Sequence, residues 1–130
     1  MLSKVHAAAL RGVEASPVEV EVHVGPGESS AVVRERVIAA RDIQQRRWHG
    51  APACNARMQP RDLQRHCTLD EPARLLLRSA MEELDLSARA YDRILKVART
   101  IADLAHSEKL TAAHVSEAIQ YRSLDRQIWT

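Results

Sequence analysis

The residues best suited to chemistry are arginines on one edge of an amphipathic segment, LSARAYDRILKVARTIADL, at positions 86–104. Arg89 stands near the start of this segment, two residues after Ser87, whose hydroxyl can accept a hydrogen bond from the first turn of a helix. A guanidinium in that place presents a planar fork of donors that suits a phosphate better than an ammonium does. The segment therefore predicts a docked helix with an arginine at its amino-terminal end. That arginine has a site-like placement for a phosphate, although on the sequence alone a solvated residue facing water is the more typical interpretation.

A stripe of apolar side chains predicts which face of this helix is buried. The stripe recurs at helical spacing and comprises Tyr91, Ile94, Leu95, Ala98, Ile101, Ala102 and Ala105. Arg93, Lys96 and Arg99 lie off the stripe, and we interpret them as candidate contacts for a nucleic acid or a neighbouring subunit. Asp92 and Asp103 interrupt this basic edge, which is also typical of a solvated helical face.

An earlier basic segment is a second candidate surface. It comprises Arg34, Arg36, Arg41, Arg46, Arg47, Arg57, Arg61 and Arg65, with Glu28, Glu35, Asp42 and Asp62 among them. Such a charge can follow a nucleic-acid backbone, and Arg46 and Arg47 are the contacts that we single out. The arginines are spread around the expected helix, and Trp48 is the only nearby aromatic residue, so base stacking has little support. A small helical DNA-binding module is therefore an alternative interpretation.

Residue types that could ligate zinc or catalyse a reaction are present without the spacing that such sites need. His49, Cys54, His66 and Cys67 include no C-x-x-C pair, and adjacent helix positions such as 66 and 67 point about 100° apart. We interpret Cys67 as a buried packing residue and predict no metal, leaving a zinc-stabilised bundle as a further hypothesis. No serine stands in a G-x-S-x-G context, and the adjacent carboxylates of Glu82 and Glu83 diverge, so no catalytic residue is predicted.

The elements that position these residues are mainly helical. From residue 29 onward the periodicity predicts helices over 30–48, 60–67, 70–86, 87–104 and 111–124, with a break at residues 50–52. The first helix is expected to bury Val33, Val37 and Ala40, and Thr111 is expected to cap the last. Before residue 25, alternating valines at positions 18, 20, 22 and 24 predict a half-buried strand, whereas the pattern of residues 2–10 alone fits a helix. The fold class predicted is mainly α, a small helical bundle with a short amino-terminal β-hairpin or strand.

Composition agrees with one small globular domain. The chain has 130 residues, of which 45% are hydrophobic and 28% charged, enough for one modest core. A net charge of +2 does not by itself indicate nucleic-acid binding. The sequence shows neither a secretory signal nor an apolar run long enough to cross a bilayer, so we expect a cytoplasmic protein without a membrane partner and with reduced cysteines.

Most of the chain resembles a known family. The segments CNARMQPRDLQRHC, LSARAYDRILKVARTIADL and HVSEAIQYRSLDR resemble the carboxy-terminal helical lid of the magnesium-chelatase-like AAA+ ATPases of the ComM/YifB type, over about residues 27–126. The segment MLSKVHAAALRGVEASPVEVEVHV resembles the first hairpin of the amino-terminal Lon-protease-like domain of that family. The resemblance implies a hairpin fragment over residues 1–24, a junction at 25–28 and a lid domain over 29–130.

The resemblance also implies a function. In the family, the arginine that corresponds to Arg89 is the sensor 2 residue, which reaches from the lid to the nucleotide phosphates, and full-length relatives are hexameric motors that use ATP and Mg²⁺ to act on DNA branches during recombination. This sequence has no glycine-rich loop ending in Gly-Lys-Ser/Thr and no Walker B pair of acids after an apolar strand. We therefore expect a truncated member without its ATPase core, with no cofactor and no ATPase activity of its own. Its expected partners are further copies of itself or AAA+ subunit neighbours.

Overall fold

The structure, a computed structural model, describes residues 2–11, 14–23, 27–49 and 53–128, with side chains described over 27–49 and 53–122. The chain divides into two compact units, Met1–Val33 and Arg34–Thr130. Residues 25 and 26 of the expected junction lie outside the described residues, as does the expected helix break at 50–52. Each unit is described below by itself.

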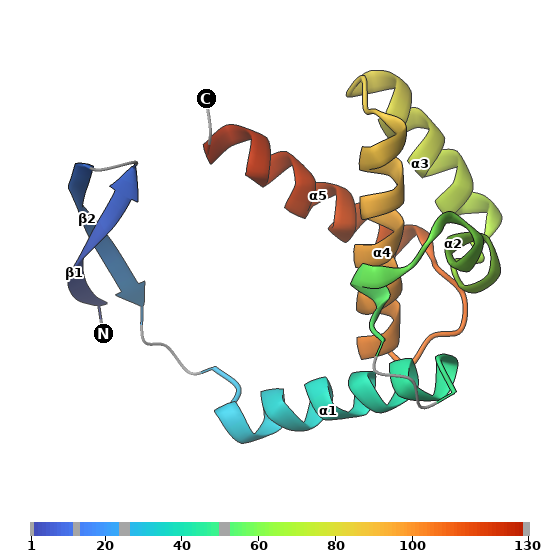
Figure 1. The fold of residues 1–130 in the computed structure, drawn as a ribbon, viewed down its shortest axis with the longest axis horizontal. Coiled ribbons are helices and arrows are strands. Elements are labelled where there is room, and N and C mark those ends of the chain that lie inside the picture. The colour runs from blue at the N-terminus through green and yellow to red at the C-terminus, as the bar shows by residue number, and fades with distance from the viewer. Residues whose placement is uncertain (1, 12–13, 24–26, 50–52, 129–130) are drawn as a thin grey trace. The chain divides into compact units, whose positions relative to one another are not determined.

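The amino-terminal unit contains a β-hairpin (Figure 1). Strand β1 (Leu2–Arg11) pairs antiparallel with β2 (Glu14–His23), and the register places Leu2 opposite His23 and Arg11 opposite Glu14. The first strand is the one that the family resemblance implies, so the helix that the pattern of residues 2–10 fits is wrong. Position 24 and the side chains of the other alternating valines lie outside the described residues.

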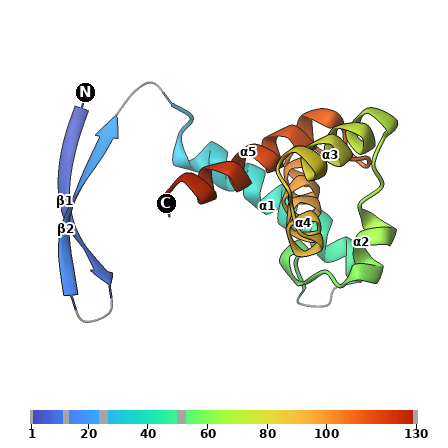
Figure 2. The ribbon, with the colours of Figure 1, turned by 90° about the horizontal axis from the view of Figure 1, so that it is seen from above.

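The second unit is a helical bundle, which confirms the mainly α prediction. Its helices are α1 (Ser30–Arg47, whose first residues belong to the other unit), α2 (Pro60–His66), α3 (Glu71–Glu83), α4 (Ala88–Leu104) and α5 (Ala112–Ile128). A short 3₁₀ turn, η1 (Asn55–Arg57), was not predicted. Figures 1 and 2 show α4 at the centre of this bundle, with α3 and α5 packed beside it. Helix α4 carries the candidate residues Arg89, Arg93, Lys96 and Arg99, while Arg46 and Arg47 lie at the end of α1.

Local signals explain where the helices begin. The hydroxyl of Ser87 accepts a hydrogen bond from the amide of Ala90 at 3.3 Å, which confirms the predicted cap of α4. A carboxylate oxygen of Asp70 accepts from the amide of Ala73 at 2.8 Å in the same way at the start of α3. At the start of α5, by contrast, the Thr111 hydroxyl lies 3.2 Å from His114 Nδ1.

The core is built from aliphatic side chains and small residues. Leu77, Ile94, Leu110 and Val115 are its largest fully buried apolar side chains. Alanines of α3, α4 and α5 are buried between them and permit close approach of the helices: Ala73, Ala90, Ala98, Ala102 and Ala118. Cys67 belongs to the same cluster, which confirms the packing role expected for it. A chain with no phenylalanine thus fills its core with aliphatic side chains and alanines.

Two predicted apolar stripes are only partly buried. In α1, Ala40 is buried, but Val33 and Val37 are 45% and 44% exposed, because the contacts that hold this helix to the bundle come from its last turns. In α4, Tyr91 is exposed and Ala90 is buried in its place. No helix within the described ranges combines the length and apolar character needed to span a bilayer.

Candidate functional site

Arg89 lies in the first turn of α4 and its side chain is exposed. Ser87 and Ala90 on either side of it hold the helix end in place, one through the capping hydrogen bond and the other through burial. The free amides of a helix amino terminus and the helix dipole both favour an anion near this end. Arg89 is thus exposed to solvent at the amino-terminal end of a capped helix.

Arg93 and Lys96 continue the same edge of α4, because positions four and seven residues after Arg89 return to nearly the same side of a helix. Arg93 is exposed, and Lys96 is half-buried. The Nζ of Lys96 donates to the carbonyl oxygen of Ala56 in η1 at 3.1 Å. Three of the four basic residues singled out on α4 therefore form one outward edge.

Arg99, the fourth, does not belong to that edge. Its residue is only 2% exposed, and its Nε donates to Asp103 Oδ1 at 3.1 Å. The two terminal nitrogens donate to backbone carbonyls of His66, Ser107 and Glu108. Neither a contact surface nor a solvated face, the two interpretations offered for Arg99, fits these contacts. The physical reason is that its guanidinium donates to carbonyls at the end of α2 and in the turn after α4, where the hydrogen-bond pattern within a helix stops.

Asp103 is the centre of a buried polar cluster that joins α1, η1 and α4. The guanidinium of Arg47 donates to both of its carboxylate oxygens, at 2.9 and 2.6 Å. The side-chain amide of Asn55 donates to Oδ2 at 2.8 Å and accepts from Arg47 at 2.8 Å. The carboxylate is fully buried and receives four hydrogen bonds from three residues. Two guanidinium groups facing one carboxylate leave the cluster with a net positive charge.

Arg47 therefore differs from its neighbour Arg46 in a way the sequence did not predict. The Arg47 side chain is 11% exposed and is occupied by Asp103 and Asn55, so the interpretation as a nucleic-acid contact does not fit it in this structure. Arg46 is exposed and borders a shallow depression with Asp42 and His49. Of the two arginines singled out on α1, only Arg46 is presented outward.

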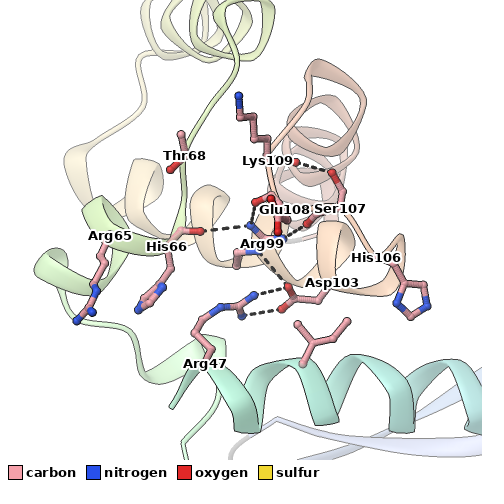
Figure 3. A pocket seen from close by; sticks show the side chains of 11 residues that line it. Arg47, Arg65, His66, Thr68, Arg99, Asp103, His106, Ser107, Glu108 and Lys109 are labelled. Atoms are coloured by element: carbon pink, nitrogen blue, oxygen red, sulfur yellow. Dashed lines mark hydrogen bonds and ion pairs between the residues drawn. The ribbon is translucent and has the colours of Figure 1, made fainter. Parts of the chain in front are cut away.

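A groove of about 600 Å³ lies over this cluster, between the end of α2 and the turn that follows α4 (Figure 3). Arg65, His66 and Lys109 line it together with the outer side of the cluster. Burial, and then the positive charges of Arg47 and Arg65, hold the pKa of His66 below its usual value of 6.5. Four basic side chains, those of Arg47, Arg65, Arg99 and Lys109, line the groove against the carboxylates of Asp103 and Glu108, so the formal charge of its lining is positive.

The two cysteines are separated in environment. Cys67 is buried, its Sγ lies 3.8 Å from the carbonyl oxygen of Leu95, and burial raises the pKa of its thiol to about 11. Cys54 is half-buried at the start of η1. Neither thiol, within the described residues, takes part in a group of three or more side chains that could hold a metal ion.

The polar cluster contains residues that sequence reasoning missed: Gln44, Asn55 and Asp103. The side-chain oxygen of Gln44 accepts from the backbone amide of Asn55 at 3.2 Å, which fixes η1 against α1. One feature of the sequence does indicate a buried polar group near Asp103. Its partner Arg99 stands four residues after Leu95 and three before Ala102, on the flank of the apolar stripe. Nothing comparable marks Asn55, because its partners are 8, 45 and 48 residues away in the chain.

These residues are carried by a small helical bundle, and its sequence assigns it to the magnesium chelatase type. Residues 27–122 match the family described as magnesium chelatase, subunit ChlI C-terminal, and the chain belongs to this family. It is 43% identical over 104 residues to the protein YifB of Salmonella typhimurium, and 43% identical over 100 residues to the competence protein ComM of Haemophilus influenzae. A Mycobacterium bovis protein is 38% identical over 98 residues.

These matches cover most of this chain and a small part of each relative. They span 80%, 77% and 74% of the chain but only 20%, 19% and 19% of the three relatives. The chain thus spans about a fifth of the length of the curated relatives that it matches. It is similar to the carboxy-terminal part of ComM/YifB-type proteins, as the resemblance over residues 27–126 implies.

Proposed function

We propose that this chain is the helical lid of a magnesium-chelatase-like AAA+ ATPase of the ComM/YifB type, with Arg89 as the residue that contacts nucleotide phosphates. The observation that carries the proposal is the exposed Arg89 in the capped first turn of α4. The match of residues 27–122 to the magnesium chelatase carboxy-terminal family supports the family part of the proposal.

The buried cluster supports this role mechanically. A lid that couples its angle to nucleotide state must transmit a pull on one arginine to the rest of the domain. Asp103 joins the helix that carries Arg89 to α1 through Arg47 and to η1 through Asn55. A displacement of α4 therefore carries α1 and η1 with it, so that the helices respond as one body.

We also propose that these 130 residues do not hydrolyse ATP by themselves. Hydrolysis needs backbone amides and a lysine around the β- and γ-phosphates, and a carboxylate for Mg²⁺. Arg89 can contact a phosphate that another polypeptide or domain holds, but one guanidinium cannot bind a triphosphate and position water. ATP, Mg²⁺ and branched DNA would be ligands of a complete motor of this type, and adjoining AAA+ subunits its partners.

The test is a graft into a relative. Residues 27–122 of this chain replace the corresponding carboxy-terminal segment of the Haemophilus influenzae ComM protein, to which this chain is 43% identical. We expect the chimera to hydrolyse ATP, and Arg89→Ala in the graft to lower the steady-state rate by about tenfold or more. Arg78→Ala, on the exposed side of α3, is the matched control and should leave the rate unchanged.

A chimera that hydrolyses ATP equally well with Arg89→Ala would refute the role of Arg89. Steady release of phosphate from ATP by the purified 130-residue chain would refute the second part of the proposal. A small helical DNA-binding module is less well supported as the function of the isolated chain, because Arg47 and Arg99 are committed to Asp103. It predicts a steep loss of DNA affinity with salt, which a gel-shift series measures.

A further inference from the structure

A second surface of the bundle has a chemistry that the lid role does not use. Two adjoining depressions run along α4, between η1 and α5, and share Ala56, Lys96, Val97 and Tyr121. They form one groove, which we call the α4–α5 groove. It follows α4 from Arg93 to Leu104, about 16 Å at 1.5 Å per residue, which is the length of three helical turns.

One end of the α4–α5 groove is basic. Arg93, Lys96 and Arg122 line it, and no described residue that lines this end is acidic. The Nε of Arg122 is buried and has no hydrogen-bond partner among the described residues. A buried donor without a partner is unfavourable, so an acceptor that the Arg122 side chain can turn toward would be favoured here. This end is therefore suited to carboxylate or other anionic groups.

The other end is apolar. Val97, Ile101 and Leu104 line it, and we call these three residues the apolar floor. Val97 and Tyr121, like Lys96, lie where the two depressions meet. Val97 is 38% exposed and Tyr121 is 54% exposed, so apolar area is left in contact with water. The only acidic residue described at this end is Glu117, and it accepts a hydrogen bond from the Tyr121 hydroxyl at 2.8 Å. Covering this floor would remove apolar surface from water, which is the main driving force of docking.

From this division of charge we propose that the α4–α5 groove binds an acidic amphipathic segment of a partner protein. Carboxylates of the segment lie against Arg93, Lys96 and Arg122, and its apolar side chains lie on Val97, Ile101 and Leu104. A groove of this length suits a short helix laid into it, with anchors spaced by one turn. The opposed ends also set the direction of the segment, since reversing it would bring carboxylates onto the apolar floor.

The same features distinguish a peptide from a nucleic acid. A phosphate backbone needs cations repeated along its path. Here Arg93 and Arg122 line one end, Lys96 lies where the two depressions meet, and the carboxylate of Glu117 stands at the other end. Base stacking needs aromatic faces, and Tyr121 is the one aromatic residue described in the groove. This proposal does not depend on Arg89 or on nucleotide, so it can fail while the proposed lid function holds.

The test begins with a phage-displayed library of random peptides of about twelve residues, selected on the full chain. We expect enriched peptides to carry acidic residues in one half and Leu, Ile, Val or aromatic residues in the other. Fluorescence anisotropy with the synthetic peptide then gives its Kd. Arg93→Glu and Val97→Asp should each weaken binding by about tenfold or more. Arg61→Glu, an equal charge change at an exposed position of α2 outside the groove, should change Kd less than about twofold.

Circular dichroism of each variant establishes that it is folded, and both substituted side chains are exposed, so their loss of binding reports on the groove. The proposal is overturned if no acidic amphipathic peptide is enriched above an unrelated control protein, or if Arg93→Glu leaves the Kd unchanged. It is also overturned if an oligothymidine probe binds in place of peptides and is weakened by Arg93→Glu. Self-association that Val97→Asp abolishes, without any peptide binding, would assign the groove to a second copy and overturn it too.

Discussion

Arg47 and Asp103 are 56 residues apart in the chain, yet the guanidinium of one donates to both carboxylate oxygens of the other, at 2.9 and 2.6 Å. This two-point contact fixes the end of α1 against α4 in distance and in orientation. Because Arg99 shares the same carboxylate at 3.1 Å, one aspartate holds two cationic groups inside the bundle. We therefore expect the stability of the domain to depend on this arrangement.

Replacing the shared carboxylate should be severely destabilising. In Asp103→Asn, the guanidinium groups of Arg47 and Arg99 stay buried without a counter-charge, so we expect a loss of about 3–5 kcal/mol in the free energy of unfolding. Urea denaturation followed by circular dichroism measures it. Asp42→Asn makes the same change at an exposed position of α1 and should stay within about 0.5 kcal/mol of the parent. A loss below about 1 kcal/mol for Asp103→Asn would contradict the importance of the cluster.

A lysine at position 47, which keeps the positive charge but not the guanidinium, should not preserve the stability of the domain. In Arg47→Lys, a single ammonium cannot contact both oxygens of Asp103 and the side chain of Asn55 together, so we expect a loss of about 1–3 kcal/mol. Amide hydrogen exchange should become faster in the last turns of α1, where this contact holds the helix. The adjacent exposed Arg46 is the matched site, and Arg46→Lys should alter neither quantity. If Arg47→Lys and Arg46→Lys had equal stability and equal amide exchange, the planar guanidinium of Arg47 would not be needed.

The two cysteines should differ in reactivity. The pKa of the buried Cys67 thiol is raised to about 11, so at about pH 8 almost none of it is the thiolate that reacts with iodoacetamide. We expect Cys54 to be alkylated first in the native protein, with Cys67 labelled only after unfolding in urea. Mass spectrometry of the proteolytic peptides measures both rates. Fast labelling of native Cys67 would show that the core around it opens readily.

Stability should depend on the protonation of His66. Its folded-state pKa is held below 6.5 by burial and by Arg47 and Arg65, so the unfolded chain takes up the proton more readily. Neutral His66 therefore contributes its full stabilisation above about pH 6.5. Below that pH the free energy of unfolding decreases as the pH falls toward the folded-state pKa of His66. Urea unfolding at about pH 7.5 and about pH 5.5 should show a larger loss for the parent than for His66→Gln. An identical loss in both would remove His66 from the explanation.

Arg89 should matter little to folding. Its side chain is exposed, so Arg89→Ala should change the free energy of unfolding by less than about 0.5 kcal/mol, as thermal or urea denaturation would measure. A loss above about 2 kcal/mol would mean that Arg89 holds the structure together instead of facing a ligand.

The positions of the helices could be predicted from the sequence because their causes are local. Apolar spacing, the Ser87 cap and Pro60 at the start of α2 act within a few residues, and these signals locate the helices closely. The resemblance carried by LSARAYDRILKVARTIADL likewise pointed to the family that the comparison over residues 27–122 shows. The exposure of Arg89 is expected in the same way, since it lies off the stripe and near a helix end.

What only the tertiary structure decided is the direction of side chains whose partners are distant in the chain. Arg46 and Arg47 are adjacent and alike in sequence, but one faces solvent and the other meets Asp103. In the sequence Arg99 resembles Arg93, but in the structure its guanidinium donates to the carbonyls of His66, Ser107 and Glu108. Periodicity reports which side of a helix is apolar, while the burial of a charge depends on whether folding brings enough donors and acceptors to replace water. That condition is set by long-range contacts, and so it is met only in the folded bundle.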